Sequence, residues 1–175
     1  MKFEQIKQHL DAYKTHNQIE DAAHFLLRSV GLEEDNFAGI GFREELSPNS
    51  ILLTTEGVLG GSQKIMIPRN LFDFDLNLVL NMLAHEMLHV KQKKKGAVVE
   101  DKNEREFQAY YEMLFHTVFP QIPDAPDFNR KQFAQKALEY YNRMDEGSDL
   151  KLKYAEQKMQ VEDLLNAILV KRGEL

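Results

Sequence analysis

The sequence contains no cysteine, and this absence limits the chemistry open to the protein. Disulfide bonds and thiolate ligands are both excluded, so a metal ion would have to be held by histidine, aspartate or glutamate. A run of about 18 apolar residues, the length that a membrane-spanning helix needs, is also absent. The longest apolar stretch, residues 76–90, is interrupted by Asn, His and Glu. We therefore expect no membrane partner.

An excess of basic charge is absent as well, because the net charge is −6 at pH 7. Nucleic-acid binding needs a positive field over the contact surface, so we expect no nucleic-acid partner. The first residues, MKFEQIKQHLDAY, are amphipathic and charged, which is atypical of a secretory signal and favours a cytoplasmic location. The 175 residues, 43% hydrophobic and 29% charged, predict a single domain over residues 1–175.

The periodicity of the apolar residues predicts the secondary structure. Helical spacing covers residues 3–14, 18–30, 75–92, 101–119, 128–145 and 149–171. Short runs typical of strands cover residues 38–44, 50–54 and 64–68. Helices, then a small sheet, then helices again indicate an α+β class. The fold is expected to be mostly helical, with a small three-stranded sheet preceding the helix at 75–92.

The helix predicted at 75–92 carries the sequence HEMLH, which is the H-E-x-x-H pattern of zinc hydrolases. His85 and His89 lie one turn apart on one helix face, so both imidazoles can reach one Zn²⁺ ion. Glu86 is turned by about 100° around the axis and can take a proton from a metal-bound water. The longer metzincin pattern fails, because Gln92 and Lys95 replace its glycine and its third histidine.

The polar residues of this helix form one stripe on an otherwise apolar surface, at Asn81, His85, His89 and Gln92. Buried polar groups cost free energy unless they have partners, and a metal-lined cleft provides them. A structural pair of core histidines, satisfied by hydrogen bonds, is the alternative interpretation.

A catalytic zinc usually takes three protein ligands, so the next helix, predicted at 101–119, should supply another. A projection at 100° per residue places Glu106 within the apolar arc and Glu104 at its edge. Glu112 and His116 fall on the opposite face. Glu106 is therefore the preferred third ligand, with Glu104 and His116 as alternatives. A buried salt bridge would also explain Glu106.

HEMLH followed by Glu106 after 17 residues resembles the gluzincin zinc peptidases, and the length resembles their minimal, single-domain members, the minigluzincins. The matching stretch covers about residues 50–119. The resemblance implies a zincin-like fold in which His85, His89 and Glu106 hold Zn²⁺ and Glu86 is the catalytic base. It also implies that an edge strand just before the metal helix binds extended peptide, and residues 64–68 fit that position.

The chain departs from the gluzincin pattern at Tyr110, where the family often has an aspartate. That aspartate would accept a hydrogen bond from a ligating histidine, and Asn81, Gln92 or Glu104 could substitute. A donor to the developing oxyanion is also needed, and the sequence leaves four choices open. These are Tyr110, Arg130, Tyr140 and Tyr141.

The resulting hypothesis is a zinc metallopeptidase that hydrolyses peptide bonds in a peptide or protein substrate through a metal-bound water activated by Glu86. One alternative is a non-catalytic helical interaction domain with a structural zinc or pseudo-active site. Another is a metal-dependent hydrolase of a non-peptide bond. The apolar spacing of the last helix could also serve a homodimer.

Overall fold

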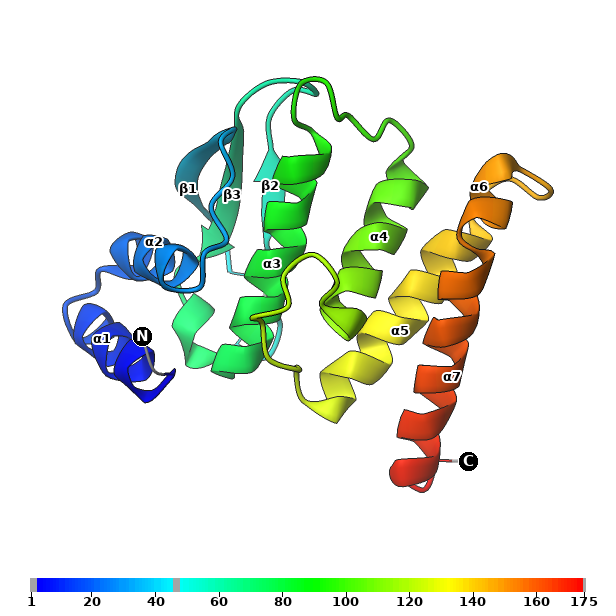
Figure 1. Cartoon of the computed structure of the whole chain (residues 1–175). Coiled ribbons are helices and arrows are strands. Elements are labelled where there is room, and N and C mark those ends of the chain that lie inside the picture. The colour runs from blue at the N-terminus through cyan, green and yellow to red at the C-terminus, as the bar shows by residue number, and fades with distance from the viewer. Residues whose placement is uncertain (1–2, 46–47, 175) are drawn as a thin grey trace. The chain divides into compact units, whose positions relative to one another are not determined.

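The computed structural model describes residues 3–45 and 48–174, and the chain divides into two compact units, residues 1–98 and 99–175 (Figure 1). The first unit contains two helices, a sheet and a third helix. The second contains helices alone in its described residues. This composition confirms the α+β class, mostly helical with a small three-stranded sheet. The single domain stays a prediction.

The first unit begins with a helical pair and ends with the long helix that carries HEMLH. Its elements are α1 (Phe3–Thr15), α2 (Ile19–Ser29), β1 (Phe37–Arg43), β2 (Thr54–Glu56), β3 (Gln63–Pro68), the short 3-10 helix η1 (Leu71–Asp73) and α3 (Leu76–Gln92). The predicted helices at 3–14, 18–30 and 75–92 are confirmed within two residues. Gly31 follows α2 with φ +66°, a left-handed conformation that glycine adopts without strain.

The strand order β1-β3-β2 corrects one expectation from the sequence. β3, the strand predicted at 64–68, pairs in parallel with β1 and antiparallel with β2, so it is the central strand. Both of its edges are occupied, and it is not an edge strand that could bind peptide. β2, which pairs antiparallel with β3, is the edge strand on one side of the sheet, and its Thr55 lies opposite Ile65 of β3.

The second strand was also predicted too early, at 50–54, whereas β2 covers Thr54–Glu56. The apolar run before β2 is only partly buried, because Leu53 is 2% exposed whereas Leu52 is 36% exposed. A short apolar run of this kind does not specify which residues pair as a strand.

α3 is the most deeply buried helix of the first unit. Asp75 caps its first turn by accepting hydrogen bonds from the main-chain N–H groups of Asn77 and Leu78. Val79 and Leu83 are inaccessible, and each of these side chains contributes about 1.5–3 kcal/mol through burial. The polar stripe of α3 is buried with them.

The second unit packs α4 (Lys102–Phe115) against α5 (Asp127–Asn142), and α5 against α7 (Ala155–Lys171), with the short α6 (Asp149–Lys153) before α7. The predicted helix at 101–119 ends earlier, because His116 adopts a left-handed conformation at φ +47°. The predicted helix at 149–171 is interrupted at Tyr154, which separates α6 from α7.

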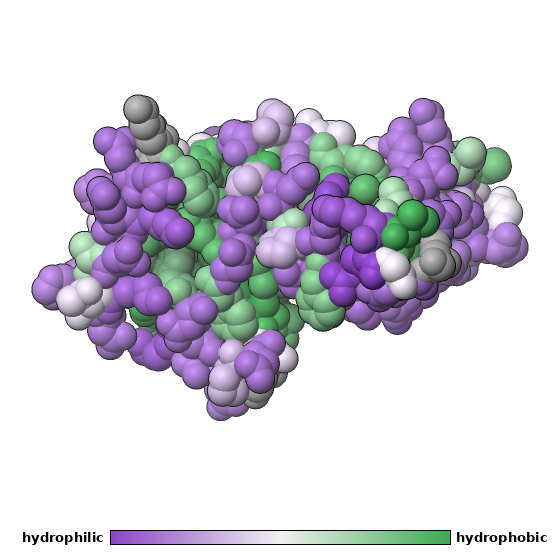
Figure 2. Space-filling view, turned by 90° about the horizontal axis from the view of Figure 1, so that it is seen from below, coloured by the Kyte–Doolittle hydropathy of each residue, from purple (hydrophilic) through white to green (hydrophobic). Residues whose placement is uncertain are grey.

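The surface seen in Figure 2 is mostly hydrophilic, with smaller hydrophobic areas between the polar ones. Apolar atoms contribute a large share of the surface of ordinary folded proteins. A homodimer formed through the last helix stays a prediction. In residues 3–45 and 48–174, no helix combines the length and the apolar character that a membrane span requires.

Candidate metal centre

α3 brings three titratable side chains of the HEMLH motif into a buried position. His85, Glu86 and His89 are only 6%, 4% and 7% exposed. Ionisable groups are almost never buried to this degree without partners. These residues therefore require either a network of hydrogen bonds or a bound ion.

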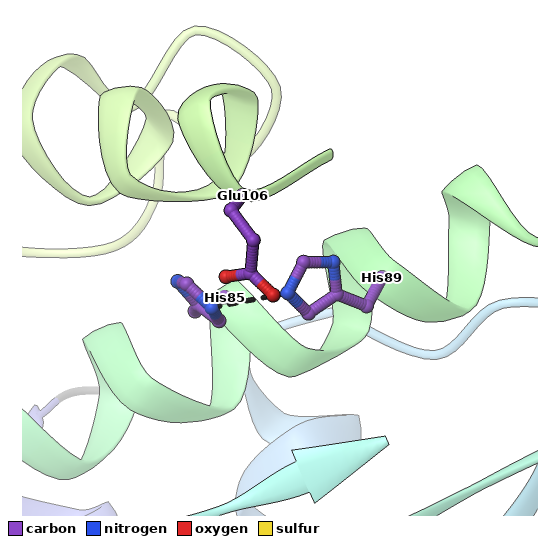
Figure 3. A group of neighbouring side chains, drawn as sticks. All are labelled: His85, His89 and Glu106. Atoms are coloured by element: carbon purple, nitrogen blue, oxygen red, sulfur yellow. Dashed lines mark hydrogen bonds between the residues drawn. The ribbon is translucent and has the colours of Figure 1, made fainter. Parts of the chain in front are cut away.

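The two imidazoles converge on one point. The Nε2 atoms of His85 and His89 lie 3.1 Å apart and the ring planes are nearly perpendicular (dashed line in Figure 3). Two nitrogens that each lie 2.0–2.1 Å from a tetrahedral zinc are about 3.3 Å from each other. The pair already has nearly the spacing that two ligands of one zinc ion need.

A hydrogen bond fixes the tautomer of His89. Its Nδ1 atom lies 2.8 Å from Oε1 of Gln92, which is 4% exposed. An amide oxygen only accepts, so Nδ1 carries the proton and the lone pair is on Nε2, the atom that faces His85. Metal-binding histidines characteristically donate their second ring N–H in this way. Gln92, one of the predicted substitute acceptors, thus contacts one of the two predicted histidine ligands.

The preferred third ligand, Glu106, is a partly buried residue of α4. Each of His85, His89 and Glu106 offers one ligand atom, and these atoms lie within 4.8 Å of one another (Figure 3). Two imidazole nitrogens and a carboxylate oxygen are a donor set that catalytic zinc takes in proteins. The residues present therefore fit the metal that the sequence predicts.

The alternative third ligands have other partners within the second unit. Glu104 accepts hydrogen bonds from Lys153 at 2.7 Å and from the hydroxyl of Tyr154 at 2.6 Å. The ammonium group of Lys153 balances the charge of the carboxylate, and the two hydrogen bonds occupy one of its oxygens. His116 lies beside Asp124, with 3.4 Å between the ring and the carboxylate. Among the residues that the structure describes, the group that could hold an ion consists of His85, His89 and Glu106 and includes neither alternative.

Glu112 corrects the helical projection, which placed it opposite the apolar face. It is 1% exposed, and its carboxylate accepts hydrogen bonds from Thr117 and from the main-chain N–H groups of Val118 and Phe119. The side chain therefore supplies acceptors for the main-chain N–H groups of the loop that follows α4. Its role is structural.

Glu86 contacts a residue that sequence reasoning missed. The hydroxyl of Thr55 on β2 lies 2.8 Å from Oε2 of Glu86 and 3.0 Å from its main-chain oxygen. Thr55 is 31 residues away in the chain and belongs to no motif. Only the folding of β2 beside α3 brings the two residues together.

The four candidate oxyanion donors differ in their surroundings. The hydroxyl of Tyr141 donates to a main-chain carbonyl of α6 at 2.9 Å, and Arg130 lies between two aspartates. These two groups are engaged in structural contacts. Tyr110 stacks on Tyr140, with 5.8 Å between ring centroids and 16° between planes. The choice among the four candidates therefore stays open.

Comparisons of the chain with protein-family models, with curated proteins and with solved structures gave no match. The functional argument for the site accordingly depends on the geometry and chemistry of its residues.

Proposed function

We propose that this protein is a zinc-dependent peptidase in which His85, His89 and Glu106 hold the metal and Glu86 is the general base. The observation that carries the proposal is the pair of buried Nε2 atoms 3.1 Å apart, with a buried glutamate directly after the first histidine. A structural histidine pair would not need that glutamate, whereas hydrolysis does.

When bound, zinc supplies a Lewis acid and lowers the pKa of water to about 7. The carboxylate of Glu86 accepts the proton of the nucleophile and returns it to the leaving amine, so one side chain acts first as base and then as acid. Its burial keeps bulk water away from the transferred proton. Gln92 keeps the proton of His89 on Nδ1 and so leaves Nε2 available.

The position of β2 favours a peptide as the substrate. In the described part of the chain β2 pairs only with β3, so it is an edge strand of the sheet. An extended peptide can add to such an edge through main-chain hydrogen bonds. Thr55 of this strand contacts Glu86, so a peptide on β2 would lie beside the proposed base.

The test combines metal content with cleavage of fluorescein-labelled casein. Wild-type protein should bind one equivalent of zinc and cleave casein. Glu86→Gln should retain the zinc and lose cleavage, because only the base is removed. Glu106→Gln should lose both, while Glu100→Gln, an exposed glutamate ahead of α4, should lose neither. Unchanged zinc in Glu106→Gln would refute the ligand assignment.

The same preparations separate the proposal from its rivals. A purely structural zinc would leave casein intact in wild type and Glu86→Gln alike. Cleavage of ester or non-peptide amide substrates, without cleavage of casein or of a peptide library, would indicate a hydrolase of another bond.

A further inference from the structure

The carboxylate of Glu86 has few hydrogen-bond partners for a buried acid. It is 4% exposed, and within residues 3–45 and 48–174 the hydroxyl of Thr55 is its hydrogen-bond partner, at 2.8 Å. A glutamate side chain has three rotatable bonds, and ordering it costs up to about 2 kcal/mol. The orientation of the proposed base therefore depends on this one contact.

Thr55 itself is fixed on three sides. Its position in β2 is set by pairing opposite Ile65, and its β-branched side chain is restricted at χ1. Its carbonyl accepts a hydrogen bond from Nζ of Lys93, the residue that follows α3, at 3.1 Å. The hydroxyl is thus presented to Glu86 by a rigid strand that is attached to the same helix.

We propose that Thr55, on the edge strand β2, is the positioning residue of Glu86 and orients its carboxylate for proton transfer. This inference rests on the proposed function, since it assigns Glu86 the role of base.

The number of protons and acceptors allows Thr55 to stay hydrogen-bonded to Glu86 both before and after Glu86 takes a proton. Thr55 has one hydroxyl proton and lies near two acceptors, the Oε2 atom and the main-chain oxygen of Glu86. While Glu86 is ionised, the hydroxyl donates to Oε2. Once Oε2 has taken a proton, it can donate to the Thr55 oxygen, whose own proton then turns to the main-chain oxygen. The carboxyl group keeps its place throughout.

The kinetic test compares three variants with the wild type on labelled casein. Thr55→Val keeps the shape and removes the hydroxyl, Thr55→Ser keeps the hydroxyl, and Thr15→Val is the matched control outside the proposed site. Thr15 is an exposed residue at the end of α1, and its hydroxyl donates to the main-chain oxygen of Asp11. We expect kcat of Thr55→Val to fall roughly 10-fold to 100-fold with KM and zinc content unchanged. Thr55→Ser should recover most of the rate, and Thr15→Val should retain it.

A second measurement does not need activity. Three-bond couplings of the Glu86 side chain, measured by NMR in zinc-loaded protein, should report one rotamer in the wild type and averaging in Thr55→Val. A single unchanged rotamer in Thr55→Val, or undiminished kcat, would overturn the assignment. If the wild type cleaves nothing, the proposed function fails on its own. The couplings still decide whether Thr55 holds Glu86.

Discussion

Replacing Gln92 with leucine should weaken zinc binding while leaving every proposed ligand in place. Gln92 is 4% exposed, and its Oε1 atom accepts the Nδ1 proton of His89 at 2.8 Å. Leucine has a similar size but no acceptor. The substitution therefore removes one hydrogen bond from a buried imidazole and introduces no charge.

The size of the expected loss in zinc affinity depends on which state, zinc-loaded or metal-free, is left with the unsatisfied hydrogen-bond donor. Zinc needs the lone pair of Nε2, so in the loaded protein His89 must carry its proton on Nδ1, which would face leucine without a partner. Leaving a buried donor unsatisfied costs about 1–3 kcal/mol, or roughly 5-fold to 150-fold in Kd. Metal-free protein avoids this cost by moving the proton to Nε2, which faces His85. The loss therefore appears as weaker binding.

Competition against a chromophoric zinc chelator at neutral pH would measure this difference directly. Gln92→Leu should bind zinc at least 5-fold more weakly than wild type, in line with the roughly 10-fold to 100-fold cost of losing such partners elsewhere. Gln92→Glu is the control, because its carboxylate still accepts from Nδ1 and should preserve or tighten binding. Equal zinc affinity for leucine, glutamate and glutamine at this position would refute the argument.

Three further expectations concern stability. Asp75→Ala should lower the free energy of unfolding by about 1 kcal/mol in urea, since α3 loses both cap hydrogen bonds, whereas Asp75→Asn should retain most of it. Glu112→Ala should cost about 2–4 kcal/mol by leaving main-chain N–H groups without acceptors, and Glu112→Gln should cost less. Burial and then Glu104 raise the pKa of Tyr154, and hydrogen bonding to Glu104 raises that of Lys153. A raised folded-state pKa contributes stability that is present below about pH 10 and is lost as pH rises further. Urea unfolding across that range should show this alkaline loss in wild type and a smaller one in Tyr154→Phe.

The parts of the fold that the sequence predicted are those set by neighbours along the chain. The helix at 75–92 is confirmed with its Asp75 cap, because capping and apolar periodicity act within a few residues. The expectation that residues 64–68 form an edge strand was wrong, because strand order depends on contacts between distant segments. Alternation of buried residues along 64–68 looks the same in a central strand and in an edge strand.

The prediction for Glu112, on the helix expected at 101–119, was wrong for a related reason. A projection assumes that one face is buried and that a carboxylate on the other face meets water. Glu112 is buried on that other face, where it accepts hydrogen bonds from the chain after the helix. Main-chain N–H groups in a buried loop need acceptors, and the pattern of apolar residues does not show which side chain supplies them.

The same distinction separates the two residues that orient the site. Gln92 lies three residues after His89 on one helix, so its contact with that ring was among the predicted ones. Thr55 lies 31 residues before Glu86, and nothing in a run of threonines marks one hydroxyl as a partner of a glutamate. A metal motif names the groups that would touch the ion and the nucleophile, because their spacing is helical. A residue such as Thr55, which holds one of these groups from a distant strand, becomes visible only when the fold is known.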